Sequence, residues 1–191
     1  GYAAAIPTME NNMFESISVK VCVPGHEESN CVPYSGGKKP EGLLQKYGRK
    51  GMRVAAFGYL NDDDYAADAP VLRARMKYLN KDNEGGLGGT RKKEWDEKTG
   101  IFALNPDSAD AAASHVPNSG VINYLNKFGD YSGYKTYDIA GELYYAALRY
   151  LRNLGAVYVR SPDEKMKDQF PAIYNWDDPL TNGLKEGVKS R

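Results

Sequence analysis

The chain has 191 residues, and its 25 Lys and Arg residues balance its 25 Asp and Glu residues, so the formal net charge is zero. This balance argues against a nucleic-acid-binding protein, which needs a net basic surface to displace counterions from phosphates. Hydrophobic residues make up 41% of the chain, enough for a packed core, and no apolar run approaches the roughly 18 residues of a membrane span. The 15 Tyr residues outnumber 5 Phe and 2 Trp and favour a binding protein, because Tyr combines contact area with a polar tip.

The two ends of the chain show no clear period. We expect residues 1–15 to be irregular and residues 181–191 to form a tail or a cut-off continuation. The chain begins at Gly1, without Met or a secretory signal pattern, so we expect it to be an excerpt of a longer protein, the alternative being a chain from which a leader was removed.

Three strands and one short helix are predicted in the first half. Residues 16–23 alternate between apolar and polar side chains, which is typical of a half-buried strand. Residues 40–48 predict a short helix, with Pro near its first turn and Gly at its end. The almost continuous apolar run 52–60 predicts a strand covered on both faces. In residues 71–79 apolar side chains alternate with charged ones, which predicts a third strand near a sheet edge.

Loops and turns are expected over residues 80–107, and two helices follow. The first has Ser119 as a possible cap and ends at Gly129, with one apolar face formed by Val121, Ile122, Leu125 and Phe128. The second follows Asp138, runs from Ile139 to Leu154 with apolar residues at three- and four-residue steps, and ends at Gly155. Strands followed by helices, with one covered apolar strand, favour an α/β or α+β domain.

The two cysteines of the chain, Cys22 and Cys31, suggest a disulfide and therefore export. A bridge between them would close a ten-residue loop and stabilise the fold by roughly 2–3 kcal/mol through the unfolded state. The alternatives are two reduced thiols in a cytosolic protein, or a zinc site with His26. Such a zinc site would need a fourth ligand, and the spacing lacks the close Cys pairs of zinc domains.

An acidic run supplies oxygen ligands of the kind that calcium prefers, at Asp62, Asp64 and Asp68. The run lacks the Gly and Glu positions of an EF-hand loop. The alternative is a solvated turn that joins two strands. The glycine-rich segment 85–93 lacks the Gly-Lys-Ser/Thr sequence of a phosphate-binding loop and predicts a surface loop instead.

Hydrolytic chemistry has few candidate residues. His26 and His115 both lie among turn residues, and no Gly-x-Ser-x-Gly sequence occurs. The carboxylate pairs Glu94/Asp96 and Asp177/Asp178 could flank a glycosidic bond. Neighbouring acidic residues on a surface are far more common than catalytic ones, so we expect a protein that is not an enzyme.

Eight segments, in this order along the chain, resemble the PilY (PilC-like) family, the large secreted factors of type IV pili. They include VKVCVPGHEESNC near the start and EWDEKTGIFALNPD in the middle, and they cover roughly residues 16–180. Their ranges are Val19–Cys31, Lys39–Gly48, Phe57–Asp62, Val71–Asn80, Glu94–Asp107, Ser119–Gly129, Gly141–Leu151 and Phe170–Pro179.

The resemblance implies an exported protein at or near the pilus tip or outer cell surface, which supports pilus assembly, restrains retraction and mediates adhesion. Family members pair an N-terminal region like a von Willebrand factor type A domain with a C-terminal β-propeller. Residues 16–180 look like the interior of the first region. The resemblance therefore implies an α/β fold, a partial type A-like domain with long loops and inserted strands. Its expected partners are minor pilins, other parts of a PilY-type protein, and a host or abiotic surface.

Type A domains carry a metal-ion-dependent adhesion site, whose Asp-x-Ser-x-Ser loop does not occur in this chain. The Thr motif of such domains has its nearest match at 141–148, where Glu142 stands in place of Thr. Together with Asp138, Glu142 could coordinate Ca²⁺ or Mg²⁺. Alternatively, these carboxylates simply interact favourably with the helix dipole.

Three hypotheses follow. The first is a non-enzymatic, pilus-associated protein that acts by binding other proteins. The second is a structural subunit of an extracellular filament, and the third is a secreted hydrolase that uses carboxylates.

Overall fold

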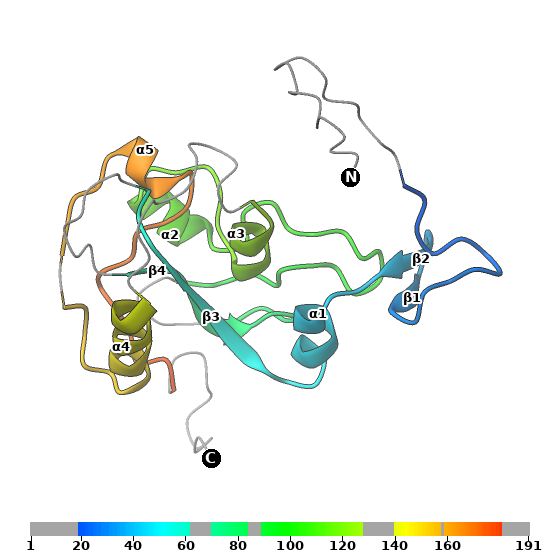
Figure 1. The fold of residues 1–191 in the computed structure, drawn as a ribbon, viewed down its shortest axis with the longest axis horizontal. Helices are drawn as coiled ribbons and strands as arrows, with labels where there is room; N and C mark the ends of the chain where they lie inside the picture. Colours follow the sequence, from blue (N-terminus) through cyan, green and yellow to red (C-terminus); the bar gives the residue numbers. More distant parts are fainter. Residues whose placement is uncertain (1–18, 62–69, 84–88, 128–139, 158, 181–191) are drawn as a thin grey trace, which may run out of the picture.

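The computed structural model describes residues 19–61, 70–83, 89–127, 140–157 and 159–180 (Figure 1). Strands and helices are mixed along the chain, so the predicted α/β class is confirmed at this coarse level. The elements are β1 (Cys31–Tyr34), β2 (Gly37–Pro40), α1 (Leu43–Gly48), β3 (Arg53–Gly58), β4 (Val71–Tyr78), α2 (Ser108–Ala113), α3 (Val121–Lys127), α4 (Ala140–Leu151) and α5 (Glu164–Lys167).

The strands of the described residues form two separate antiparallel pairs, β1 with β2 and β3 with β4. The β3–β4 pair crosses the body of the molecule, with α3 and α4 packed against it, whereas the β1–β2 hairpin projects at the opposite end from α4 (Figure 1). The register of β3 and β4 shifts twice, between Val54 and Ala56 and between Ala56 and Phe57. Such irregularities increase local twist and change which way a side chain points.

Two apolar clusters form the core. The larger one joins Ala56 and Ala74 of the central sheet to α3 and to Trp95, and it consists of Ala56, Ala74, Leu79, Trp95, Val121, Ile122, Tyr124 and Phe170. The smaller one is centred on Leu72, Tyr150 and Ile173. In it Phe57, Tyr150 and Trp176 meet edge to face, with ring centroids 5.5–5.6 Å apart. The C-terminal part of the described chain is therefore part of the core.

The predicted helix 40–48 and strands 52–60 and 71–79 are confirmed as α1, β3 and β4. β3 is only partly covered, because most of its side chains are half-buried. β4 lies at the edge of its two-stranded sheet, as predicted, but its charged side chains do not face solvent. Arg73, Arg75 and Lys77 are all buried, because other segments of the chain cover that side of the strand with carboxylates and backbone carbonyl groups.

The strand predicted over 16–23 is wrong for the part of it that the structure describes. Residues 19–23 form no strand, and Val19 and Val21 are exposed. The backbone of Cys22 has φ 53°, in the left-handed region, which an extended strand does not allow. The alternating pattern therefore does not produce a strand at this position.

The two later helices are confirmed as α3 and α4, with differences at their faces and ends. Leu125 is 56% exposed, whereas Tyr124 is buried in its place on α3. Ser119 accepts a hydrogen bond from the backbone N–H of Asp107 rather than from α3. Phe128, Gly129, Asp138 and Ile139 lie outside the described residues, as do the segments 1–15 and 181–191.

Candidate functional site

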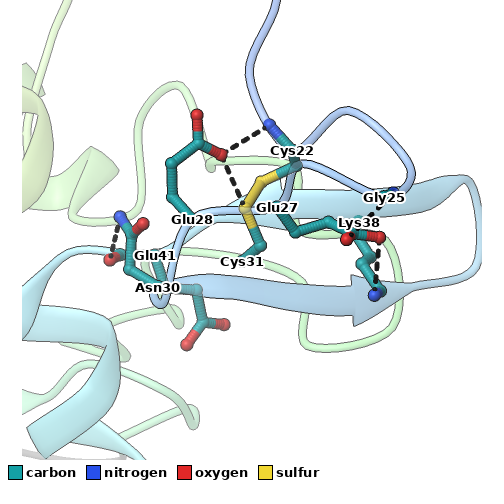
Figure 2. The surroundings of a disulfide bond; sticks show 8 residues. All are labelled: Cys22, Gly25, Glu27, Glu28, Asn30, Cys31, Lys38 and Glu41. Carbon is teal, nitrogen blue, oxygen red and sulfur yellow. Dashed lines mark hydrogen bonds and ion pairs between the residues drawn. A yellow bond between two sulfur atoms is a disulfide. The ribbon is translucent and has the colours of Figure 1, made fainter.

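A disulfide joins Cys22 to Cys31 and closes the loop that leads into β1. Glu28 lies inside this loop (Figure 2). Its Oε2 accepts a hydrogen bond from the Cys22 N–H at 2.9 Å and lies 3.1 Å from Cys31 Sγ. Glu27 points the other way and pairs with Lys38 of β2 at 2.9 Å, and this hydrogen bond lowers its pKa. The loop is thus held to the hairpin by one covalent bond and one ion pair.

The hairpin is fixed to the body of the molecule through Tyr34. Its hydroxyl donates a hydrogen bond to Glu41, whose carboxylate also pairs with Arg49 at 2.5 Å. Burial alone would raise the pKa of Glu41, but the hydrogen bonds from Arg49 and Tyr34 outweigh it and lower the pKa. The Tyr34 ring packs on Gly100, where a side chain would collide with it. The Ser35 N–H also donates to the Lys98 carbonyl at 2.9 Å.

Two helices expose apolar side chains at different ends of the molecule. On α1, Leu43 is 69% exposed and Tyr47 is 42% exposed. On α4, Tyr144 is 69% exposed and Leu148 is 39% exposed. Leu151 continues the same side of α4 one turn later and is also exposed. Contiguous apolar surface of this kind marks contacts with other proteins, so both helices are candidate binding surfaces.

A buried network of charged side chains surrounds β4. Lys77 Nζ lies 2.6 Å from Asp107 and 2.9 Å from Glu94. Arg75 contacts Asp110 at 3.0 Å and Asp177 at 3.1 Å. Asp177 also pairs with Arg91. The network comprises Arg75, Lys77 and Arg91, with Glu94, Asp107, Asp110 and Asp177.

Burial raises the pKa of Asp107 to about 6, with the nearby Lys77 opposing the shift and Glu94 adding to it. The four carboxylates of the network exceed its three cations, which fits one carboxyl group that ionises with difficulty. Glu94 also accepts hydrogen bonds from the N–H groups of Val121 and Ile122, at 3.0 and 3.3 Å, and so caps α3. The network is sealed from solvent, and each of its charged groups has an ion-pair partner, although Arg91 Nε and Asp107 Oδ2 have no hydrogen-bond partner among the described residues. Such pairing between distant segments fits a structural role.

The candidate hydrolase residues are not brought together. Glu94 is buried at the start of α3, whereas Asp96 lies in a turn, where hydrogen bonds from Thr99 lower its pKa to about 2. Asp177 belongs to the buried network, and Asp178 accepts from the Leu180 N–H. His26 and His115 are exposed.

A surface cleft of about 520 Å³ is lined by Asp110, Ala113, Ser114, Val159, Ala172, Ile173, Tyr174 and Asn175. Its one carboxylate, Asp110, is already paired with Arg75.

The candidate metal ligands are only partly described. Asp62, Asp64, Asp68 and Asp138 lie outside the described residues. Glu142 is half-buried in the first turn of α4, and within the described part of the chain its Oε2 has no hydrogen-bond partner. Across that same part, one group of His, Cys, Asp and Glu side chains is close enough to share an ion, namely Cys22, Glu28 and Cys31. Both sulfurs are already bonded to each other, which removes the thiolate ligands that the zinc alternative requires.

The chain is 42% identical, over 194 residues, to a protein from Xylella fastidiosa (strain Temecula1) described as a type IV pilus biogenesis factor PilY1 homolog. Over this length the chain is similar to that PilY1 homolog. The similarity covers 91% of the chain but only 16% of the length of that relative. No family model matches the chain, and no solved structure matches it. The family resemblance is confirmed at this level, while the type A-like fold of residues 16–180 stays a prediction. None of the described helices has the length and apolar composition that crossing a bilayer requires.

Proposed function

We propose that the chain works within a PilY-type factor in type IV pilus biogenesis, and that it acts by binding other proteins rather than by catalysis. The observation that carries this proposal is the 42% identity to a pilus biogenesis factor over 91% of the chain. The expected location is the outer cell surface or the pilus tip. A Cys22–Cys31 bridge supports this location, because structural disulfides persist outside the reducing cytosol.

The expected partners are minor pilins or other parts of a PilY-type protein. The exposed apolar side of α4, formed by Tyr144, Leu148 and Leu151, supports a protein partner. Adhesion to host or abiotic surfaces and control of retraction also belong to this proposal, on the strength of the family resemblance. We also propose, from the family resemblance, that residues 16–180 form a type A-like arrangement. The structure of a longer PilY-type protein tests this, because a type A-like domain requires a central sheet.

The proposal extends to the binding of Ca²⁺ or Mg²⁺ by Asp62, Asp64 and Asp68, or by Asp138 with Glu142. The buried Oε2 of Glu142 favours the second set, because a cation would pair with it. Calorimetric titration of the chain with each ion, and of a Glu142→Gln variant, tests this. Equal heats for the two proteins would exclude Glu142 as a ligand.

The binding proposal is tested with the full-length PilY-type protein that contains this chain. We expect the double substitution Tyr144→Ser and Leu148→Ser to reduce co-purification with minor pilins and to lower the number of surface pili. A matched control replaces two exposed apolar residues elsewhere, Ile101→Ser and Leu104→Ser. Wild-type protein that purifies without any pilus component would contradict the proposal, whereas loss in both variants would contradict a specific role of α4.

A further inference from the structure

An exposed apolar group on and beside α1 is bordered by lysines. The apolar side chains are Leu43, Tyr47 and Met52, and Met52 is 40% exposed. Leu43 and Tyr47 are four residues apart and therefore share one side of the helix. Met52 follows closely, because its N–H donates to the Tyr47 carbonyl at 3.2 Å. We call these three residues, together with Lys46 and Lys50, the α1 patch.

The two lysines of the α1 patch lie on either side of Tyr47 in the sequence and against its ring. Lys46 Nζ is 6.0 Å and Lys50 Nζ is 5.7 Å from the ring centroid. Both lysines are exposed, so their ammonium groups remain available to a partner. Cations held near an aromatic ring are partly oriented before a partner arrives, which reduces the entropy lost on binding.

The surroundings of the α1 patch are strongly basic although the whole chain is neutral. Residues 38–53 contain six Lys or Arg residues and a single acidic residue, Glu41. The Glu41 side chain is only 6% exposed, and its charge is matched by Arg49 at 2.5 Å. Lys39 over Tyr34 and Lys81 over Tyr78, with Nζ 6.0 and 3.8 Å from the ring centroids, repeat the same pairing near by. Two of the six cations are paired with acidic side chains from elsewhere, Lys38 with Glu27 and Arg49 with Glu97 as well as Glu41. Among the described residues, the positive charge of this region that lies outside ion pairs is that of Lys39, Lys46, Lys50 and Arg53.

The other side of α1 is fixed to the core. Gly48 lies against Trp95 and Leu79, where an added Cβ would be 3.1 Å from the Trp95 ring. Gln45 is buried, and its side chain accepts a hydrogen bond from the Gly42 N–H at 3.0 Å, which closes the start of the helix. Leu43, Lys46 and Tyr47 of the α1 patch are thus held on a packed helix, and Lys50 and Met52 follow in the turn directly after it.

We propose that the α1 patch is the docking site for an acidic segment of a partner protein, in which Asp or Glu side chains flank one apolar side chain. The apolar side chain contacts Leu43, Tyr47 and Met52, and the flanking carboxylates pair with Lys46 and Lys50. This arrangement follows the usual pattern of an apolar centre with a charged rim. A short acidic segment fits better than a nucleic acid, because the basic region is local and the whole chain carries no net charge. The inference rests on the proposed function, in that the partner is a protein.

The test uses the purified chain and a synthetic peptide with one Trp flanked by Asp and Glu residues as the probe. We expect binding that weakens as salt is raised, and a loss of affinity of at least about tenfold in the double variant Lys46→Glu with Lys50→Glu. The control Lys92→Glu with Lys127→Glu carries the same change in charge on exposed side chains outside the patch and is expected to bind within about twofold of wild type. Leu43→Ser should also weaken binding, without a change in the salt dependence.

Equal affinity of the patch variant and the control variant would overturn the inference. So would tighter binding of a double-stranded oligonucleotide or of phosphatidylglycerol vesicles than of the peptide, with the same dependence on Lys46 and Lys50. Co-purification of the full-length variants with minor pilins separates this inference from the proposed function. If the α4 substitutions abolish co-purification and the α1 substitutions do not, the α1 inference fails while the proposed function stands.

Discussion

Lys77 Nζ lies 2.6 Å from Asp107 Oδ1 in the interior of the molecule, and both side chains are sealed from water. The same ammonium group is also shared with Glu94. One cation between two carboxylates leaves an excess of negative charge in a region that solvates it poorly. Because positive charge is in short supply here, the free energy of unfolding depends on pH in a way that surface carboxylates do not produce.

Asp107 should make a contribution to the free energy of unfolding that falls as the pH rises from about 4 to about 6. The pKa of Asp107 is raised from 3.8 to about 6, chiefly by burial, so the folded chain binds more protons than the unfolded chain in this window. The stabilisation is complete at a pH below the pKa of Asp107 in the unfolded chain, and it is lost as the pH rises through the pKa of Asp107 in the folded chain. This contribution to the free energy of unfolding changes by about 3 kcal/mol between these limits. Urea unfolding at a series of pH values, compared with Asp107→Asn, measures it. Identical pH slopes in the two proteins would show that Asp107 is not responsible.

Replacing Arg75 by Lys should destabilise the fold by about 3 kcal/mol. The guanidinium group reaches Asp110 through Nε, Asp177 through Nη1, and Asn175 through both Nη atoms. A single ammonium group cannot span these positions, so at least one buried carboxylate loses its partner. Arg152→Lys, at an exposed position, is the control and should leave the urea midpoint unchanged. Equal midpoints for the two variants would contradict a structural role for the Arg75 contacts.

Gly58→Ala should destabilise the fold by about 1–3 kcal/mol, because the added methyl group would overlap the buried Tyr124 hydroxyl. Tyr124→Phe removes that oxygen and should recover part of the loss in the double variant. A thermodynamic cycle of the four proteins gives the coupling energy. Strictly additive effects of the two substitutions would mean that the predicted overlap does not occur.

Glu28→Gln should speed reduction of the Cys22–Cys31 bridge by dithiothreitol about fivefold at low salt. The Glu28 carboxylate lies 3.1 Å from Cys31 Sγ, where it repels an attacking thiolate and disfavours the negative charge on the departing sulfur. Glu27→Gln is the matched control, because Glu27 lies in the same loop but pairs with Lys38. Thiol release over time gives both rates. The prediction fails if the two variants react alike, or if the difference persists at 1 M salt.

The sequence patterns located three of the described helices and the central strands, because those elements depend on local periodicity. α1, β3, β4, α3 and α4 all lie where the spacing of apolar residues places them. The β1–β2 hairpin was not predicted, although Ser35 and Gly36 between its strands form a recognisable turn signal. Its strands have only four residues each and include Pro33 and Pro40, so their alternation is too short to stand out.

The buried charges could not be predicted from local pattern. An alternating strand with Arg73, Arg75 and Lys77 on one side is typical of a strand with one face in water. The carboxylates that neutralise two of these cations come from distant positions, such as Asp107 and Asp177. Only tertiary structure brings them to β4. The short helices α2 and α5 depend in the same way on contacts with the rest of the chain, because six and four residues are too few to be stable alone.

The α1 patch illustrates a third limit. Its residues are visible in the sequence as part of a predicted helix, but the side of α1 that faces solvent follows from the packing of Gly48 on Trp95. The disulfide could be predicted from the number and spacing of the cysteines alone. A docking surface can be recognised only when it is known which side of the helix packs on the core.

The three cations of β4 have a second consequence, for the chain before it folds. Val71–Tyr78 combines β-branched, aliphatic and aromatic residues with the length of an ordinary strand, which are properties of segments that self-associate into intermolecular sheets. A positive charge at every second position makes two such segments repel each other while they are exposed. Folding then supplies the carboxylates that neutralise Arg75 and Lys77, so most of this repulsion is removed only once the chain has folded.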